Sequence, residues 1–204
     1  KNTEYNVCVK CVVGELHGIW NDIVTFKTKR NISVDSIILS EEANGESFKE
    51  KLYEWCRTKD FELLYRGSRD GFNVNKFHEK CDNKGKTLVL AKNIKGHVFG
   101  GFASIPWTSP SSCEHKQAPG SFLFTLTNMY GIQPTKFPLK NDYDGNATVH
   151  YPGNGPVFGN GHDICCGGTD KTSKDISTRF PFTYEDTTGK GFSIFSSTTE
   201  SRLF

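Results

Sequence analysis

Short segments in which apolar residues recur at every second position constrain this fold most. In residues 121–127, Phe122, Phe124 and Leu126 are in phase. Successive side chains of a strand point to opposite faces, so this period places the three residues on one face of a β-strand. Further strands are expected at residues 5–13, 19–26, 34–39, 61–65, 87–92, 97–104, 147–151 and 191–196, and residues 155–166 are expected to form a turn that enters a strand.

Helical periodicity is confined to two short segments. In residues 47–57 apolar side chains recur at helical spacing, and Ser47 followed by Glu50 has the pattern of a capping box. Residues 73–81 repeat the helical spacing over a shorter length. Strands therefore dominate, and no alternation of strand and helix suggests a parallel sheet. We predict a mostly β (α+β) fold, with two antiparallel sheets packed as a β-sandwich and flanked by a few short helices.

The composition agrees with this class and excludes several functions. The 204 residues include 16 Phe, 7 Tyr and 20 Gly but one Met, which favours strands and turns. A net charge of +2 gives no electrostatic argument for nucleic-acid binding. No apolar run approaches the roughly 18 residues of a membrane span. The seven cysteines are odd in number and irregularly spaced, which indicates reduced thiols and a cytoplasmic protein.

Glycine and proline mark the irregular parts of the chain. Gly100 and Gly101 lie inside a predicted strand, where they indicate a bulge or a close approach of two backbones. Residues 105–120 and 131–160 are rich in Pro, Gly, Ser, Asn and Asp, so we expect long loops there, with one short strand inside the second.

Residues 63–72, LLYRGSRDGF, place two arginines and one carboxylate at the end of a strand. Arg66 and Arg69 could clamp an anionic ligand or partner, because a guanidinium presents a planar fork of donors. In the alternative interpretation, Asp70 accepts bonds from turn amides or from one arginine, and the flanking glycines permit unusual backbone angles. We favour a turn fixed by Asp70, with one arginine left for a ligand.

Five motifs occur in an order that resembles the TLDc domain of oxidation-resistance proteins: LLYRGSRDGF, FHEKCDNKGKTLVL (77–90), GHVFGGFASIPW (96–107), SFLFTL (121–126) and FGNGHDI (158–164). The resemblance covers residues 36–204. It leaves residues 1–35 as an N-terminal β extension. The C-terminal sequence GFSIFSSTTESRLF matches the closing strand of the family only approximately.

The resemblance implies a function as well as a β-sandwich. Members of the family protect cells against oxidative stress, and several bind the vacuolar proton pump (V-ATPase) and regulate its assembly. We therefore expect a non-enzymatic, cytoplasmic module that binds a protein partner, with the V-ATPase as the expected partner. The resemblance implies no cofactor.

Histidine, cysteine and aspartate clusters leave alternatives open. His78 and Cys81 could form a metal or Cys–His pair, or a surface histidine beside a core thiol. The run GHDICCGG brings His162 and Asp163 close to two cysteines, Cys165 and Cys166, which suits a metal site, a sensor thiol or a structural strand.

Two further pairs of residues have spacings that occur in metal-binding motifs. Asp142 and Asp144, two residues apart, resemble the start of a calcium loop, but the sequence does not continue as an EF-hand. Cys8 and Cys11 form a Cys-x-x-Cys inside a strand pattern, where their side chains would point to opposite faces.

Two alternatives to the interaction module follow from these clusters. One is a redox or metal-dependent enzyme that uses exposed Cys and His. The other is a calcium- or ligand-sensing domain that uses the long loops. The candidate binding residues are Arg66, Arg69, Asp70, His78, His162 and Asp163.

Overall fold

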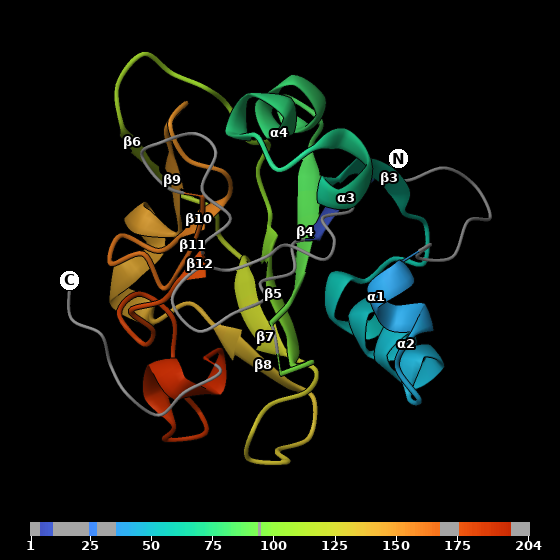
Figure 1. The fold of residues 1–204 in the computed structure, drawn as a ribbon. Helices are drawn as coiled ribbons and strands as arrows, with labels where there is room; N and C mark the ends of the chain where they lie inside the picture. Colours follow the sequence, from blue (N-terminus) through green and yellow to red (C-terminus); the bar gives the residue numbers. More distant parts are fainter. Residues whose placement is uncertain (1–4, 10–24, 28–35, 94, 168–175, 197–204) are drawn as a thin grey trace.

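The computed structural model describes residues 5–9, 25–27, 36–93, 95–167 and 176–196 (Figure 1). Within these ranges the strands form two sheets, and the α-helices have 4 to 12 residues each. The predicted mostly β sandwich with a few short helices is confirmed.

The larger sheet has the strand order β2-β3-β1-β4-β5-β7-β8. From β4 to β8 every neighbouring pair is antiparallel, whereas β1 pairs in parallel with both β3 and β4. Its strands are β1 (Tyr5–Val9), β2 (Thr25–Lys27), β3 (Glu62–Arg66), β4 (Lys86–Lys92), β5 (Val98–Ala103), β7 (Phe122–Thr125) and β8 (Thr135–Pro138).

The smaller sheet is antiparallel throughout, in the order β12-β11-β10-β9-β6. Its strands are short: β6 (Glu114–Lys116), β9 (Thr148–His150), β10 (Val157–Phe158), β11 (Ile164–Cys166) and β12 (Ile176–Ser177). β9 is the short strand predicted within residues 131–160, whereas β6 and β8 lie in parts of the two segments that were predicted as loops. These segments are therefore more ordered than their composition indicates.

The helices lie outside the sheets (Figure 1). They are α1 (Ile37–Ser40), α2 (Gly45–Cys56), α3 (Gly67–Asp70) and α4 (Val74–Cys81), with 3-10 helices η1 (Asn141–Asn146) and η2 (Gly191–Ile194). In the described part of the chain, none of the helices has the length and apolar character needed to cross a membrane.

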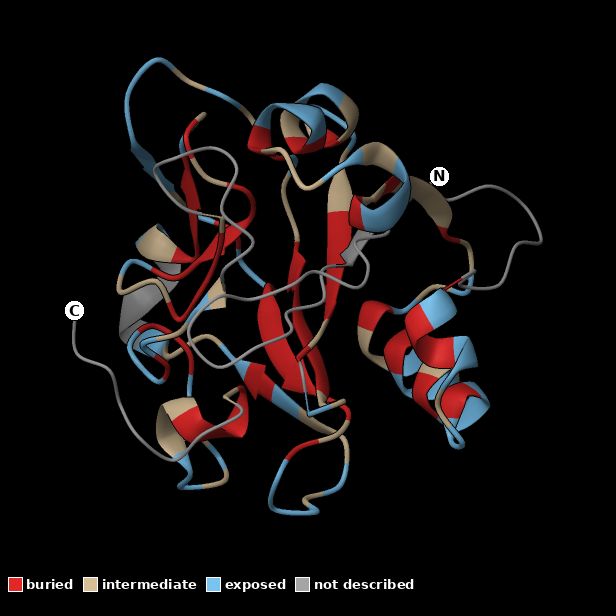
Figure 2. Ribbon diagram, in the orientation of Figure 1, coloured by how far each residue is buried: buried red, intermediate tan, exposed pale blue. Residues whose placement is uncertain are grey.

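The larger sheet is buried on both faces, and Figure 2 shows its central strands buried along their length. Along β4, Leu88 and Leu90 pack in a cluster with residues of α1 and α2, whereas Val89 and Ala91 join a second cluster with the smaller sheet. The period of two therefore sends alternate side chains into two separate cores. This explains why residues 88–91 of β4 are all apolar and do not alternate with polar residues.

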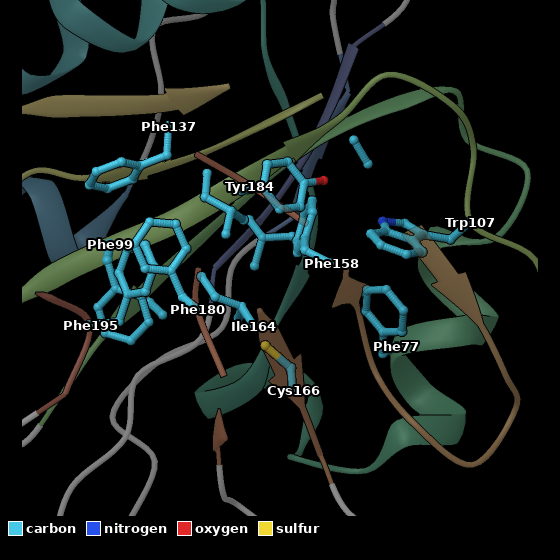
Figure 3. Close-up of a cluster of buried hydrophobic side chains, with 14 of the residues drawn as sticks. Phe77, Phe99, Trp107, Phe137, Phe158, Ile164, Cys166, Phe180, Tyr184 and Phe195 are labelled. Carbon is cyan, nitrogen blue, oxygen red and sulfur yellow. The ribbon is translucent and has the colours of Figure 1, made fainter. Parts of the chain in front are cut away.

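Aromatic side chains fill the space between the sheets (Figure 3). The Trp107 ring meets Phe158 of β10 edge-on at 5.5 Å between centroids. Phe180 lies 4.9 Å from the rings of both Phe137 and Phe195. Tilted and edge-on contacts at these distances suit the aromatic quadrupole and contribute beyond the area they bury.

Gly100 and Gly101 are positions of close approach. A Cβ on Gly100 would lie 1.7 Å from the carbonyl oxygen of Val89, and one on Gly101 would lie 2.7 Å from the Phe158 ring. The register between β4 and β5 continues through both glycines. Of the two predicted alternatives, close approach is therefore correct and a bulge is not.

Two predicted strands are wrong. Residues 37–39 of the predicted strand 34–39 belong to α1, because Ser36 is the N-cap and its hydroxyl accepts the Leu39 amide. Residues 191–194 form η2 instead of a strand. Asp186 accepts the Gly191 amide at 2.7 Å and curls the chain, and Gly191 has a φ of 58°.

The start of α2 also differs from the prediction. Helix 47–57 is confirmed, but it begins at Gly45, so Ser47 lies in the first turn and cannot act as the cap. A Cβ at Gly45 would lie 1.9 Å from the carbonyl oxygen of Leu39. Glycine therefore allows α1 and α2 to meet closely, and this contact sets the start of the helix. The prediction of helix 73–81 is confirmed by α4.

We expect Gly101→Val to unfold the domain or to lower its free energy of unfolding by about 3 kcal/mol or more, because the side chain overlaps Phe158 in a filled core. Chemical denaturation measures the change. Gly145→Ala is the control, because nothing lies within 4 Å of its added Cβ. An unchanged midpoint for Gly101→Val would contradict the close approach.

Candidate functional site

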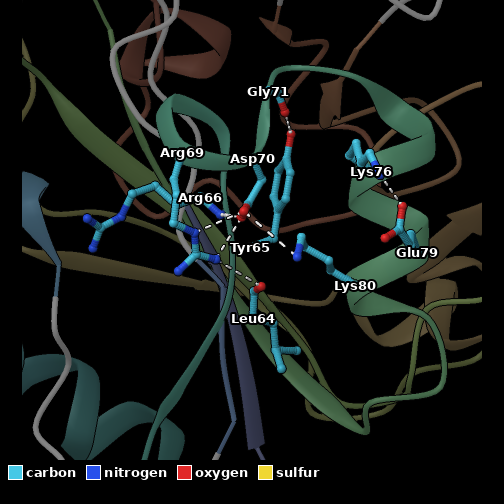
Figure 4. Close-up of polar contacts among 9 residues, drawn as sticks. All are labelled: Leu64, Tyr65, Arg66, Arg69, Asp70, Gly71, Lys76, Glu79 and Lys80. Carbon is cyan, nitrogen blue, oxygen red and sulfur yellow. Dashed lines mark hydrogen bonds and ion pairs between the residues drawn. The ribbon is translucent and has the colours of Figure 1, made fainter.

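Asp70 ties the end of β3 to α3, and Lys80 from the last turn of α4 approaches the same carboxylate (Figure 4). Its Oδ2 accepts the backbone amide of Arg66 at 2.8 Å and Nη2 of Arg69 at 2.7 Å. Its Oδ1 accepts Nε of Arg69 at 2.9 Å, and Nζ of Lys80 lies 3.8 Å away. Arg69 thus binds the carboxylate with two parallel bonds, the strongest geometry for such a pair.

Tyr65 and Gly71 complete this turn. The buried Tyr65 hydroxyl donates to the carbonyl of Gly71 at 2.6 Å, and Gly71 has a φ of 86°, which favours glycine. The Tyr65 ring meets Phe77 of α4 edge-on at 6.0 Å. Arg69 also reaches the carbonyl of Leu64 at 3.4 Å. The motif 63–72 therefore forms one hydrogen-bonded unit, built around a carboxylate of which 9% is exposed.

The pKa of Asp70 is lowered from its ordinary value. Partial burial acts to raise it, but hydrogen bonds from the Arg69 side chain and the Arg66 amide outweigh burial, together with the charges of Arg69 and Lys80. Because the folded pKa lies below the unfolded pKa, the contribution of this group to stability is present at neutral pH. It is lost as the pH falls through the folded pKa.

Three cations surround the turn at the surface, and we call them the α4 basic face: Arg69, Lys76 and Lys80. Their side chains are 47%, 51% and 34% exposed. Lys76 pairs with Glu79 at 2.6 Å, so this face carries one positive charge more than Asp70 and Glu79 neutralise. Arg66 is half-buried, and its amide is fixed by Asp70.

His78 faces Asp82 and not Asp70. Its Nδ1 lies 2.9 Å from Oδ1 of Asp82, and its Nε2 lies 2.7 Å from the carbonyl oxygen of Asn154. The hydroxyl of Ser109 donates to the other oxygen of Asp82. We call these four residues the Asp82 network. In a hydrolytic triad the serine meets the histidine, whereas here it meets the carboxylate, so the network connects segments without an activated nucleophile.

Asp163 is fully buried and organises a loop. Its carboxylate accepts the amides of Phe182 at 2.7 Å, Thr183 at 2.9 and 3.1 Å and Tyr184 at 3.4 Å. A Cβ at Gly159 would lie 2.0 Å from the same carboxylate. Burial raises the pKa of Asp163, while the hydrogen bonds from Thr183 and its neighbours act to lower it. The residue binds backbone amides that would otherwise be unsatisfied.

His162 is adjacent to Asp163 in sequence but has a different environment. It is half-buried with a φ of 60°, and its carbonyl accepts the amide of Arg179 at 3.1 Å. Burial lowers the pKa of His162, and the positive charges of Arg179 and His115 add to this effect. The ring is therefore biased towards its neutral form.

The cysteine candidates are buried. Cys166 belongs to the core cluster between the sheets, and Cys165 packs with Val149 and Val157. Cys81 is also fully buried, on the inner side of α4. Among the described residues, no group of three or more His, Cys, Asp or Glu side chains is arranged to hold a metal ion.

The side chains of the remaining candidate residues lie outside the described part of the structure. Asp142 and Asp144 are in η1, but their side chains are outside the description, as are Cys11 and the side chain of Cys8. A hollow beside α2 is lined by Ser47, Glu50, Lys51, Tyr53, Glu54, Arg57, Thr58 and Lys59. None of the candidate residues lines it.

Comparison with protein families agrees with this architecture. A model of the TLDc domain matches residues 32–202, nearly the whole chain. The chain belongs to the TLDc domain family. Comparison with curated proteins gives no significant match.

Sequence reasoning missed a buried histidine in this TLDc domain. His150 lies 5.1 Å from the Trp107 ring, its Nδ1 lies 3.1 Å from the Thr108 amide, and its Nε2 lies 3.0 Å from the Thr148 hydroxyl. The Thr108 amide must donate, so Nδ1 accepts and the proton is on Nε2. Burial, followed by the charge of Lys116, lowers the pKa of His150 to about 4. The sequence did offer an indication, because Thr148 and His150 are two residues apart in a short strand and therefore lie on the same face of it.

We expect Asp70→Asn to lower the free energy of unfolding at pH 7 by about 2 kcal/mol, because it removes the charge from a nearly buried, bidentate pair. Urea denaturation measures the loss, which should disappear once the pH is below the folded pKa of Asp70. Glu79→Gln, on the neighbouring helix α4, is the control, because its pair with Lys76 is exposed. Equal midpoints for Asp70→Asn and the parent chain would contradict the bracing role.

We expect acid to destabilise this domain through His150. Between about pH 6.5 and pH 4 the unfolded state binds a proton at this histidine and the folded state does not, so stability falls as the pH falls. The loss reaches about 3 kcal/mol, at about 1.4 kcal/mol for each pKa unit. Chemical denaturation at several pH values across this range should show a weaker pH dependence of the unfolding free energy in His150→Gln. The pH dependence should be unchanged in His115→Gln, which alters an exposed histidine. The same slope in His150→Gln would refute the assignment.

Proposed function

We propose that this TLDc domain is a non-enzymatic, cytoplasmic protein-interaction module that acts in the response to oxidative stress, and that it binds the V-ATPase and regulates its assembly. The observation that carries the proposal is the family match over residues 32–202. The structure supports an interaction role because its polar candidates hold the fold, while its surface charges remain accessible.

The buried polar groups are engaged within the domain. Asp163 binds backbone amides, His150 is enclosed by Thr108 and Thr148, and His78 is held between Asp82 and Asn154. Groups fixed in this way specify the fold, since each would be costly to leave unpaired. Binding then depends on residues at the surface.

The buried thiols support the same conclusion. Of the five thiols that the structure describes, Cys113 is exposed, whereas Cys56, Cys81, Cys165 and Cys166 are buried, and burial raises the pKa of Cys56 well above its usual range. Since the thiolate is the reactive form of cysteine, an apolar environment makes a thiol inert. These four residues therefore act as packing groups more than as redox centres.

The α4 basic face is the surface we propose for an acidic partner. Arg69 is fixed by Asp70, so its guanidinium loses little conformational entropy on binding. Lys76 and Lys80 project from the adjacent helix. Complementary charge at such a surface increases the association rate and selects the partner.

We also propose that residues 1–35 form an N-terminal extension of the domain. β1 lies between β3 and β4 in the larger sheet, where it pairs with both. Because β1 is an interior strand, its backbone pairing connects β3 to β4 and so joins the two parts of the larger sheet.

The proposal predicts that the purified chain, added to membranes that contain the V-ATPase, binds the pump, inhibits ATP-driven proton transport and releases the soluble sector in a dose-dependent way. Proton uptake and sedimentation of the soluble sector measure these effects. Absence of both binding and inhibition over the full concentration range would refute the V-ATPase assignment.

A pair of matched variants tests the surface. Lys76→Glu and Lys51→Glu each reverse the charge of an exposed lysine that pairs with a glutamate three residues later on a helix. We expect Lys76→Glu to weaken binding by about tenfold and to reduce its salt dependence, with little effect from Lys51→Glu. Equal effects of the two variants would exclude the α4 basic face.

A further inference from the structure

Residues 104–113 connect β5 to β6, and the connection is anchored at Trp107. The Trp107 indole donates to Thr87 at 2.8 Å, and its carbonyl accepts the amide of Asn83 at 2.9 Å. Asp82 and Trp107 also form an isolated parallel bridge. The first part of the loop is therefore fixed to the end of α4 through buried and backbone contacts.

After Trp107 the loop reaches the surface, where Ser109 attaches it to Asp82. Ser109 is exposed, and its hydroxyl donates to Asp82. Through Asp82 and His78, this one hydroxyl is connected to the carbonyl of Asn154, in the segment between β9 and β10. The residues that follow, 111–115, are exposed.

Ser109 is also distinguished by its sequence. It is followed by Pro110, and the other seven of the eight prolines follow Ile, Ala, Gln, Phe, Tyr, Gly and Phe. Ser109 is thus the single Ser or Thr of the chain that precedes proline. A residue before proline is biased towards extended backbone, which is the conformation in which protein kinases bind their substrates.

We propose that Ser109 is a phosphorylation site for a proline-directed protein kinase, and that its phosphorylation releases residues 108–113 from Asp82. The Ser109 oxygen attacks the γ-phosphorus of ATP and a new O–P bond forms. The bond from that phosphorus to the β,γ-bridging oxygen breaks, ADP leaves and the hydroxyl proton is lost. This proposal does not depend on the identity of the partner.

The electrostatics of the Asp82 network favour release. Phosphorylation removes the hydroxyl donor and places a charge of about −2 beside the carboxylate that now accepts from it. Repulsion between the two anions separates the loop from the end of α4. Lys116, which donates to Thr108 at 2.9 Å and pairs with Glu114 at 3.1 Å, is a cation available to the displaced phosphate. The Trp107 anchor remains buried, so the change is local.

Incubation of the whole folded chain with ATP and a proline-directed kinase tests the first half of the proposal. Mass spectrometry should show one phosphate, on Ser109, and none on Ser109→Ala. Ser112→Ala, which changes an exposed serine of the same loop, should be modified like the parent chain. Phosphorylation of a peptide spanning residues 104–114 but not of the folded chain would overturn the proposal, and so would a phosphate elsewhere.

Hydrogen exchange of the phosphorylated chain tests the second half. The Thr108 amide is a suitable reporter, because it donates to His150 at 3.1 Å. We expect phosphorylation to accelerate its exchange by about fivefold, the factor that corresponds to the loss of one hydrogen bond of typical strength. In Asp82→Asn, which removes the repulsion but keeps an acceptor, the acceleration should be smaller. Unchanged exchange, or equal acceleration in Asp82→Asn, would refute the release.

Discussion

The larger sheet has an apolar layer on each face, and the rest of the structure depends on this constraint. In β4, Leu88 and Leu90 face the layer of α1 and α2, while Val89 and Ala91 face the smaller sheet. A substitution in the central strands therefore affects one core or the other according to its phase. Packing on both faces also requires glycine at positions 100 and 101, because the backbone of Val89 and the ring of Phe158 occupy the space that a side chain would fill.

Carboxylates provide the second level of organisation, because the segments outside the sheets lack ladder partners for their amides. Asp70, Asp163 and Asp186 each accept from several donors, and in all three cases at least one donor is a backbone N–H group. A buried or half-buried carboxylate that satisfies several amides costs less to desolvate than an isolated one. The acidic residues in the family motifs thus account for local structure before any ligand is considered.

The sequence was most informative where an element depends on its own residues. The alternation in residues 121–127 and the helical spacing of 73–81 reflect burial of one local pattern, and both elements were found. Asp70 was also accessible to reasoning, since its donors Arg66 and Arg69 are neighbours in sequence.

Prediction failed where distant contacts decide the structure. The strand pattern of residues 37–39 gives way to α1, which packs its apolar side chains against α2. The first turn of α2 is set by the contact of Gly45 with Leu39, which no local capping motif reveals. The Asp82 network joins residues 78, 82, 109 and 154, and no spacing in the sequence indicates that these four meet. Short Cys and His spacings leave the function class open for the same reason, because burial decides what a thiol or imidazole can do.

α4 connects the two surfaces on which our proposals rest. It carries Lys76 and Lys80, and it ends directly before Asp82, which holds the Ser109 loop. A helix of this length extends about 12 Å, close to the distance over which charges interact at physiological ionic strength. A phosphate added at one end would therefore reduce the positive potential of the α4 basic face as well as free the loop. An acidic partner bound to that face would experience both effects, so one helix could couple modification of the domain to its affinity for a partner.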